Sequence, residues 1–127
     1  MNKSTKRFDL EDRTTQFAKT VVKLCLELPR GPINNRLIDQ AVGSAGSIGA
    51  NYREANDAIG RKDFLQKLKV SRREAKENLH WLELISVANI NKEQQIIPLL
   101  QEVNELIKIL SSIINKLKVK NLSDNDS

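Results

Sequence analysis

The chain has 127 residues, a formal net charge of +5 at pH 7, only 4% aromatic residues and a single cysteine. This length suits one domain whose core needs neither a metal nor a disulfide, and a lone Cys25 excludes an intrachain disulfide. A polar N-terminus and the absence of any apolar run long enough to span a bilayer exclude a signal peptide and a membrane protein, so we expect a cytoplasmic one. Few glycines and prolines, with Leu, Ile, Val, Lys and Glu dominant, favour a helical bundle over a sheet protein.

The first predicted helix covers residues 10–28 and follows a polar, basic segment over residues 1–9. Asp9 is a suitable N-cap, and Glu11 and Asp12 fall in the first turn, where the helix dipole favours acidic side chains. Apolar residues at helical spacing then form a core stripe of Leu10, Phe17, Val21, Leu24, Cys25 and Leu28.

Two prolines and a glycine over residues 29–32 predict a short loop before the second helix. That helix is predicted from Asn34 or Asn35, whose side chains can cap it, to about Ile59. Its core stripe consists of Leu37, Ala41, Ile48, Tyr52, Ala55 and Ile59.

The segment from Gly43 to Glu54, GSAGSIGANYRE, has the composition of a loop but lies inside this helical repeat. Each glycine in a helix interior costs about 1 kcal/mol relative to alanine, so we expect close packing to compensate. At about 100° per residue, the face opposite the core stripe carries small residues where a lone bundle normally has charges. We therefore predict a homo-oligomer whose interface contains Gly43, Gly46, Ser47 and Ala50; the alternative is a slightly frayed helix in a monomer.

The third helix is predicted over residues 62–88, with Gly60 ending the helix before it and Asp63 in its first turn. Alanine and serine in the middle of its stripe allow a close approach to the second helix. Asn51 and Glu54 of that second helix can cap or bridge to the third helix, for example to Lys67 or Lys76. The stripe consists of Phe64, Leu68, Ser71, Ala75, Leu79, Leu82 and Ile85. Trp81, on a flank outside it, belongs either to the core, which we favour, or to a subunit contact.

The fourth helix is predicted from Lys92 or Pro98 to Leu117, because proline can occupy a first turn or kink a helix that began earlier. The apolar stripe of this fourth helix consists of Leu99, Val103, Leu106, Leu110, Ile113 and Leu117. Residues 118–127 are polar and lack periodicity, so we expect a disordered tail. The predicted fold is an all-α, left-handed, antiparallel up-down four-helix bundle over residues 10–117.

The sequence gives little support for an enzyme. Di-iron bundles use a Glu-x-x-His pair on each of two helices, and here Glu77 and His80 form one such pair without a second histidine. Cys25 falls in a core stripe, where a thiol is usually inert, and the glycines at 43, 46 and 49 follow no strand and lack the lysine of a phosphate loop. We expect no catalytic residue, metal, cofactor or small-molecule substrate.

The distinctive charge pattern lies on the third helix. Residues 61–76 contain seven basic and two acidic residues, a net charge of +5 that equals that of the whole chain. Such a one-sided pattern suits phosphates, which supply most sequence-independent nucleic-acid affinity, although a solvated face with salt bridges is the alternative. The candidate nucleic-acid-binding residues are Lys62, Lys69, Arg72, Arg73, Lys76 and His80.

Several segments resemble the bacterial four-helix-bundle family of 23S rRNA intervening sequence proteins. The resemblance covers nearly the whole chain through FDLEDRTTQFAK, LPR, SIGANYREA, KDFLQKL and EAKENLHWLELI. It implies an up-down bundle that assembles into a ring-like oligomer, typically a pentamer, with a nucleic-acid-binding relative among the accessory proteins of diversity-generating retroelements. It implies no enzymatic activity.

Two functions are compatible with these sequence features. The first is a non-catalytic homo-oligomer that binds the backbone of RNA or DNA or serves as a scaffold, with weak sequence specificity, because no recognition helix or aromatic stacking platform is visible. The alternative is an oligomeric protein-interaction module whose basic stripe meets an acidic protein.

Overall fold

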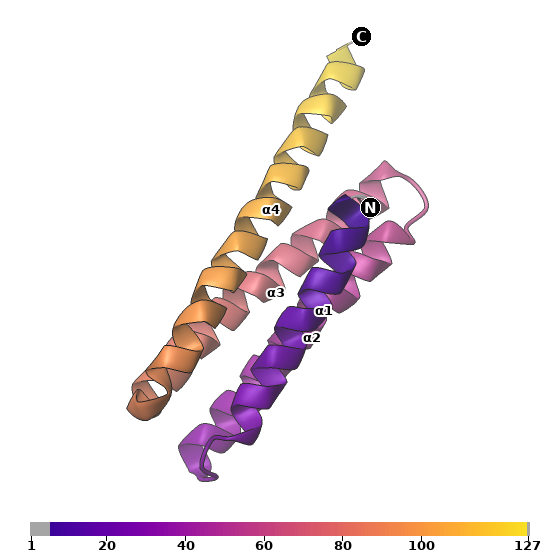
Figure 1. The fold of residues 1–127 in the computed structure, drawn as a ribbon. Coiled ribbons are helices and arrows are strands. Elements are labelled where there is room, and N and C mark those ends of the chain that lie inside the picture. The colour runs from indigo at the N-terminus through magenta and orange to yellow at the C-terminus, as the bar shows by residue number, and fades with distance from the viewer. Residues whose placement is uncertain (1–5, 127) are drawn as a thin grey trace.

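The computed structural model describes the backbone of residues 6–126 and the side chains of residues 10–118 (Figure 1). Its elements are α1 (Lys6–Leu26), α2 (Pro32–Asn56), α3 (Arg61–Ala88), a 3₁₀ turn η1 (Ile90–Lys92) and α4 (Glu93–Asp126). Each helix packs antiparallel beside the next, and α4 also meets α1, so the described helices occupy the four corners of a bundle. The contact between α2 and α3 is the most extensive and that between α1 and α4 the least. The predicted all-α four-helix bundle is confirmed.

The core contains most of the predicted stripes. All six residues of the first predicted stripe are buried, five on α1 and Leu28 just after its end. On α2 the buried residues of the predicted stripe are Leu37, Ala41, Ile48, Tyr52 and Ala55. Ile59 was predicted in this core but is 96% exposed, because α2 ends at Asn56 before reaching it. On α4, Ile114 is fully buried while the predicted Ile113 only packs against the core edge.

Helix α1 begins earlier than predicted, at Lys6, and ends at Leu26. Asp9 therefore lies inside the helix, and its predicted role as N-cap is wrong. The reason is local, because no glycine or proline occurs between Lys6 and Leu10 to stop the helix. The rest of the predicted N-terminal segment, residues 1–5, lies outside the described residues.

Helix α2 begins at Pro32, whose fixed φ and missing amide suit the first helical turn. The predicted asparagine caps are wrong, since no side chain caps this helix. The Asn34 amide instead donates to the Pro29 carbonyl at 2.8 Å and forms a reciprocal pair with the Asn89 amide, at 3.0 Å each way. The Asn35 carbonyl oxygen accepts from the Gly31 amide at 3.4 Å. These bonds fasten the α1–α2 loop to the end of α3.

Gly60 has φ of +93°, in the left-handed region that glycine tolerates best. It precedes the first residue of α3, at the end of a connection over residues 57–60, and so does not directly terminate α2. Substitution of Gly60 by any residue with a Cβ would strain this turn.

Helix α4 begins at Glu93, so Pro98 lies inside it, in agreement with the earlier of the two predicted starts. The helix continues to Asp126, nine residues beyond the predicted end at Leu117. No glycine or proline follows Leu117 to terminate it, and the loss of apolar periodicity alone did not do so. In Figure 1 this last part of α4 extends past the ends of the other helices. No helix in the described part of the chain is long and apolar enough to cross a membrane.

Candidate nucleic-acid interface

The six predicted basic residues all lie on the solvent side of α3. The core positions of this helix, Leu68, Ser71, Ala75, Asn78, Leu82 and Ile85, are buried. Lys62, Arg73, Lys76 and His80 are exposed, whereas Lys69 and Arg72 are half-buried. The amphipathic pattern of α3 therefore presents these side chains away from the core, as predicted.

A contact between Arg72 and Ser111 identifies the neighbour of this basic face. Arg72 Nη1 donates to Ser111 Oγ of α4 at 3.3 Å. On the other flank of α3, Ser71 and Asn78 bond to the backbone of α2. Lys69 and Lys76 lie one turn before and after Arg72, so they border the flank of α3 nearest α4. Lys62, Arg73 and His80 lie about 80–100° around the helix from Arg72, on the face that points away from the core.

Most cations of this face have no acidic partner. No carboxylate lies within 4.0 Å of Lys62, Lys69, Arg73 or Lys76 among the described side chains. Lys67, on the opposite flank, differs because it pairs with Glu54 at 2.7 Å. The hydrogen bond from Lys67 to Glu54 raises the pKa of the lysine, and the carboxylate's charge adds to the shift. The predicted bridge from Glu54 to helix three is thus confirmed, while the side chain of Asn51 bonds only to Ser47 O of its own helix.

A second polar row, which the sequence analysis did not identify, lies beside the basic face on α4. Its members share the spacing of three, four and seven residues around Ser111, and none is acidic: Asn104, Lys108, Ser111, Asn115 and Lys118. All are exposed except Ser111, which is half-buried. The spacing was visible in the sequence, but the flank of α4 that meets α3 becomes known only from the Arg72–Ser111 contact.

The small residues predicted at a subunit interface lie on the outer face of α2. Gly43, Gly46 and Ala50 are exposed and Ser47 is half-buried. A Cβ added to Gly43 or Gly46 would meet no atom within 4 Å. Within the described part of the chain, nothing therefore requires glycine at these two positions.

Gly49 has a different environment, because it is buried against α1. A Cβ there would lie 3.3 Å from Thr14 Cβ and only 2.9 Å from Thr14 Oγ1, a distance that real Cβ atoms essentially never show. The free energy that a glycine costs inside a helix is offset at this position by the close packing of α1. The sequence pattern did not predict this contact.

Hydrogen bonds between buried side chains and the backbone join α2 and α3. Ser71 Oγ donates to Ile48 O at 2.8 Å, and the Asn78 amide donates to Ala41 O at 2.9 Å and to Ser44 Oγ at 3.0 Å. Asn78 is fully buried, and its Oδ1 accepts no hydrogen bond from the described residues. These buried polar groups, apart from Ser71, were absent from the predicted core.

The candidates for chemistry are dispersed. Glu77 and His80 are exposed, and among the described residues no group of three His, Cys, Asp or Glu side chains could hold a metal ion. The His80 ring makes an edge contact with half-buried Trp81, with centroids 5.0 Å apart. Trp81 packs against the core cluster, as preferred from the sequence.

Burial raises the pKa of the Cys25 thiol to about 11, which leaves little of the reactive thiolate at neutral pH.

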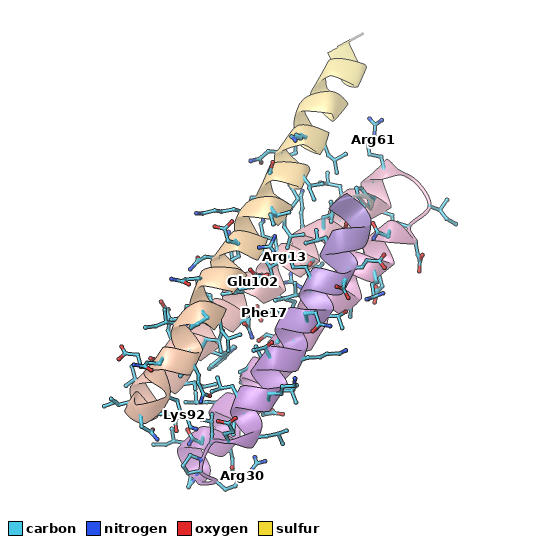
Figure 2. All side chains as sticks on the ribbon, in the orientation of Figure 1. Arg13, Phe17, Arg30, Arg61, Lys92 and Glu102 are labelled. Atoms are coloured by element: carbon cyan, nitrogen blue, oxygen red, sulfur yellow. The ribbon has the colours of Figure 1, made fainter. Side chains whose placement is uncertain are left out.

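A pocket lies between α1 and α4, where Figure 2 shows Arg13, Phe17 and Glu102. Its charged groups neutralise each other, because Arg13 Nε and Nη2 donate to the two carboxylate oxygens of Glu102 at 2.6 and 2.9 Å. The remaining lining is Gln16, Phe17, Thr20, Gln95, Pro98 and Leu99. The pocket holds neither a nucleophile nor an unpaired charge, so the basic face of α3 is the better candidate for a binding surface.

Comparisons with known proteins agree with this fold. A family model described as 23S rRNA-intervening sequence protein matches residues 6–112. A crystal structure of a protein of unknown function from the S23 ribosomal protein family of Bacteroides thetaiotaomicron is 34% identical, with a TM-score of 0.72. The match covers 82% of this chain and 96% of that one. No curated protein matches the chain.

Proposed function

The chain belongs to the 23S rRNA-intervening sequence protein family, and we propose that it is a non-catalytic, homo-oligomeric protein that binds the backbone of RNA or DNA. The observation that carries the proposal is the basic face of α3, where Lys62, Lys69, Arg73 and Lys76 lack acidic partners among the described side chains. Unpaired lysines and arginines bind phosphates by displacing counterions from the nucleic acid. We propose a cytoplasmic location, where such nucleic acids are accessible.

Oligomerisation would strengthen this binding. One stripe of four or five cations binds phosphates weakly at physiological salt, whereas copies of the stripe in one assembly raise the effective concentration of cations. The exposed small-residue face of α2 supports an assembly, because Gly43 and Gly46 have no close neighbour within the described chain. A pentamer, as the family resemblance implies, is the proposed form.

The test is binding of fluorescent 20-nucleotide RNA and DNA to the intact protein over a range of salt concentrations. We expect the variant Lys69→Gln/Arg73→Gln/Lys76→Gln to lower the slope of log affinity against log salt by about 2 to 3. The matched control Lys19→Gln/Lys23→Gln/Arg36→Gln removes three exposed cations from α1 and α2 and should leave the α3 contacts intact. Equal losses in the two variants, or no binding at low salt by the wild-type oligomer, would contradict the proposal.

A second candidate is an oligomeric protein-interaction module. Four strongly exposed apolar side chains at one end of the bundle favour it: Leu26 (71%), Ile33 (68%), Val87 (76%) and Ile90 (78%). Contacts between Asn34 and Asn89 and between Glu27 and Lys92 join the segments that carry these residues. Failure to bind either nucleic acid at low salt would favour this function, with an acidic protein as the partner of the basic face.

A further inference from the structure

The platform formed by α3 and α4 has two parallel rows of donors. The α3 row consists of Lys62, Lys69, Arg73, Lys76 and His80, and the α4 row of Asn104, Lys108, Ser111, Asn115 and Lys118. Arg72, beside the α3 row, donates to Ser111 of the α4 row and fixes the register of the two rows. Adjacent packed helices have axes 8–10 Å apart, so the rows are separated by roughly 10 Å.

Neither row contains an acidic residue. Asp63 and Glu74 of α3 lie on its other flanks, judged by their spacing from Arg72. Two carboxylates border the rows: Glu77 lies one turn from Arg73 and His80, and Glu105 pairs with Lys108 at 3.6 Å on the exposed surface of α4. At 1.5 Å per residue the α3 row extends about 27 Å and the α4 row about 21 Å. Lysine, asparagine and serine side chains all contact phosphate and sugar oxygens in nucleic-acid complexes. The platform therefore offers contacts to two backbones at once.

The platform lacks the features that bind single strands. Proteins that hold a single strand stack its bases on aromatic side chains, as well as contacting its phosphates. Among the side chains of residues 10–118, Phe17 and Tyr52 are buried, and Phe64 and Trp81 pack against the core. The Trp81 ring meets the platform only through its edge contact with His80. The two strands of a duplex, in contrast, present rows of phosphates on either side of a groove.

From these observations we propose that the α3–α4 platform binds double-stranded nucleic acid, with one row of side chains on each of its two backbones. This inference rests on the nucleic-acid-binding function proposed above and specifies its ligand. A single strand would contact the α3 row alone, whereas the α4 row would contribute only to duplex binding.

The test compares a 20-base-pair RNA duplex, a DNA duplex of the same sequence and their separate strands, by fluorescence anisotropy at 0.1 M salt with the intact protein. We expect at least one duplex to bind roughly 60-fold more tightly than its strands, since Lys108 and Lys118 add two phosphate contacts and each contributes slightly less than a factor of ten at 0.1 M relative to 1 M salt. Lys108→Gln/Lys118→Gln should remove this preference and leave single-strand affinity nearly unchanged. The matched control Lys116→Gln/Lys23→Gln removes two exposed lysines elsewhere and should preserve the preference.

The outcomes separate this inference from the function on which it rests. Equal or tighter binding of the single strands overturns the duplex assignment but leaves nucleic-acid binding intact, as does an α4 variant that keeps its duplex preference. Absence of binding to all four probes at low salt overturns both proposals. Circular dichroism of each variant shows whether the fold is retained, so that unfolding is not mistaken for loss of contact.

Discussion

Gly43 and Gly49 lie six residues apart on α2 in opposite environments, so alanine should change stability in opposite directions. At Gly43 a Cβ meets nothing within 4 Å, and Gly43→Ala should raise the free energy of unfolding of the isolated chain by up to about 1 kcal/mol. At Gly49 the Cβ would collide with Thr14, and Gly49→Ala should lower it by about 1 to 3 kcal/mol. Urea denaturation measures both changes. Thr14→Ala in the Gly49→Ala background should restore part of the loss, and a stabilising Gly49→Ala would contradict the close contact with α1.

Glu74 on α3 predicts a pH-dependent change in stability. Burial raises the pKa of its carboxyl and the neighbouring Glu77 raises it further, while Arg73 opposes the shift. Because the folded state then binds this proton more tightly than the unfolded chain, the free energy of unfolding falls as pH rises from the ordinary pKa of 4.5 toward the raised value. Glu74→Gln should therefore raise Tm at pH 7 and have little effect below pH 4.5. Exposed Glu83→Gln is the control, and an equal rise in Tm at both pH values would exclude ionisation as the cause.

At the scale of elements, the hydrogen bonds of Asn78 fasten α3 to α2. Asn78→Ala removes the donors to Ala41 O and Ser44 Oγ and leaves a small cavity, so we expect a loss of about 2 to 4 kcal/mol in the free energy of unfolding. Asn104→Ala is a matched control, because exposed Asn104 bonds only to Leu100 O of its own helix. Its effect should stay within about 0.5 kcal/mol. Similar losses in the two variants, measured by thermal denaturation, would show that the buried hydrogen bonds contribute little.

The comparison of sequence with structure shows which features depend on local information. Periodicity predicted the core faces of all four helices, because each apolar stripe is specified within its own segment. The predicted capping role of Asn34 was wrong, since α2 already begins at Pro32 and the Asn34 side chain bonds to Asn89, which is distant in sequence. The role of Gly49 depends on Thr14 of another helix, and the α4 row depends on which flank of α4 meets Arg72. The flank by which one helix packs on another cannot be predicted from the sequence of either helix alone.

At the scale of the whole molecule, the outer face of α2 tests the proposed assembly. If a neighbouring copy packs on this face, Gly46→Leu must clash with it and should dissociate the oligomer, because the isolated chain leaves the position open. In a monomer the same substitution should instead stabilise the helix, by up to about 1 kcal/mol. Light scattering measures the mass of both proteins. Lys19→Leu, which adds the same side chain to exposed α1, should keep the assembly.

Two results would contradict this prediction. One is a wild-type chain that scatters as a monomer, and the other is a Gly46→Leu chain that retains its assembly and gains thermal stability. Either would leave the basic face of α3 to bind its ligand as a single copy, with the low affinity expected of so few cations.

The order in which helices contact one another has a consequence for how the chain folds. The most extensive contact joins α2 to α3, which are consecutive, whereas the contact of α1 with α4, the first and last helices, is sparse. Chains dominated by contacts between neighbouring segments fold rapidly, because little loop entropy is lost before native contacts form. During synthesis, α1, α2 and α3 can assemble before α4 has left the ribosome, with α4 completing the bundle last. The nascent protein therefore exposes the core-facing sides of α1 and α3 for the time needed to synthesise the 34 residues of α4.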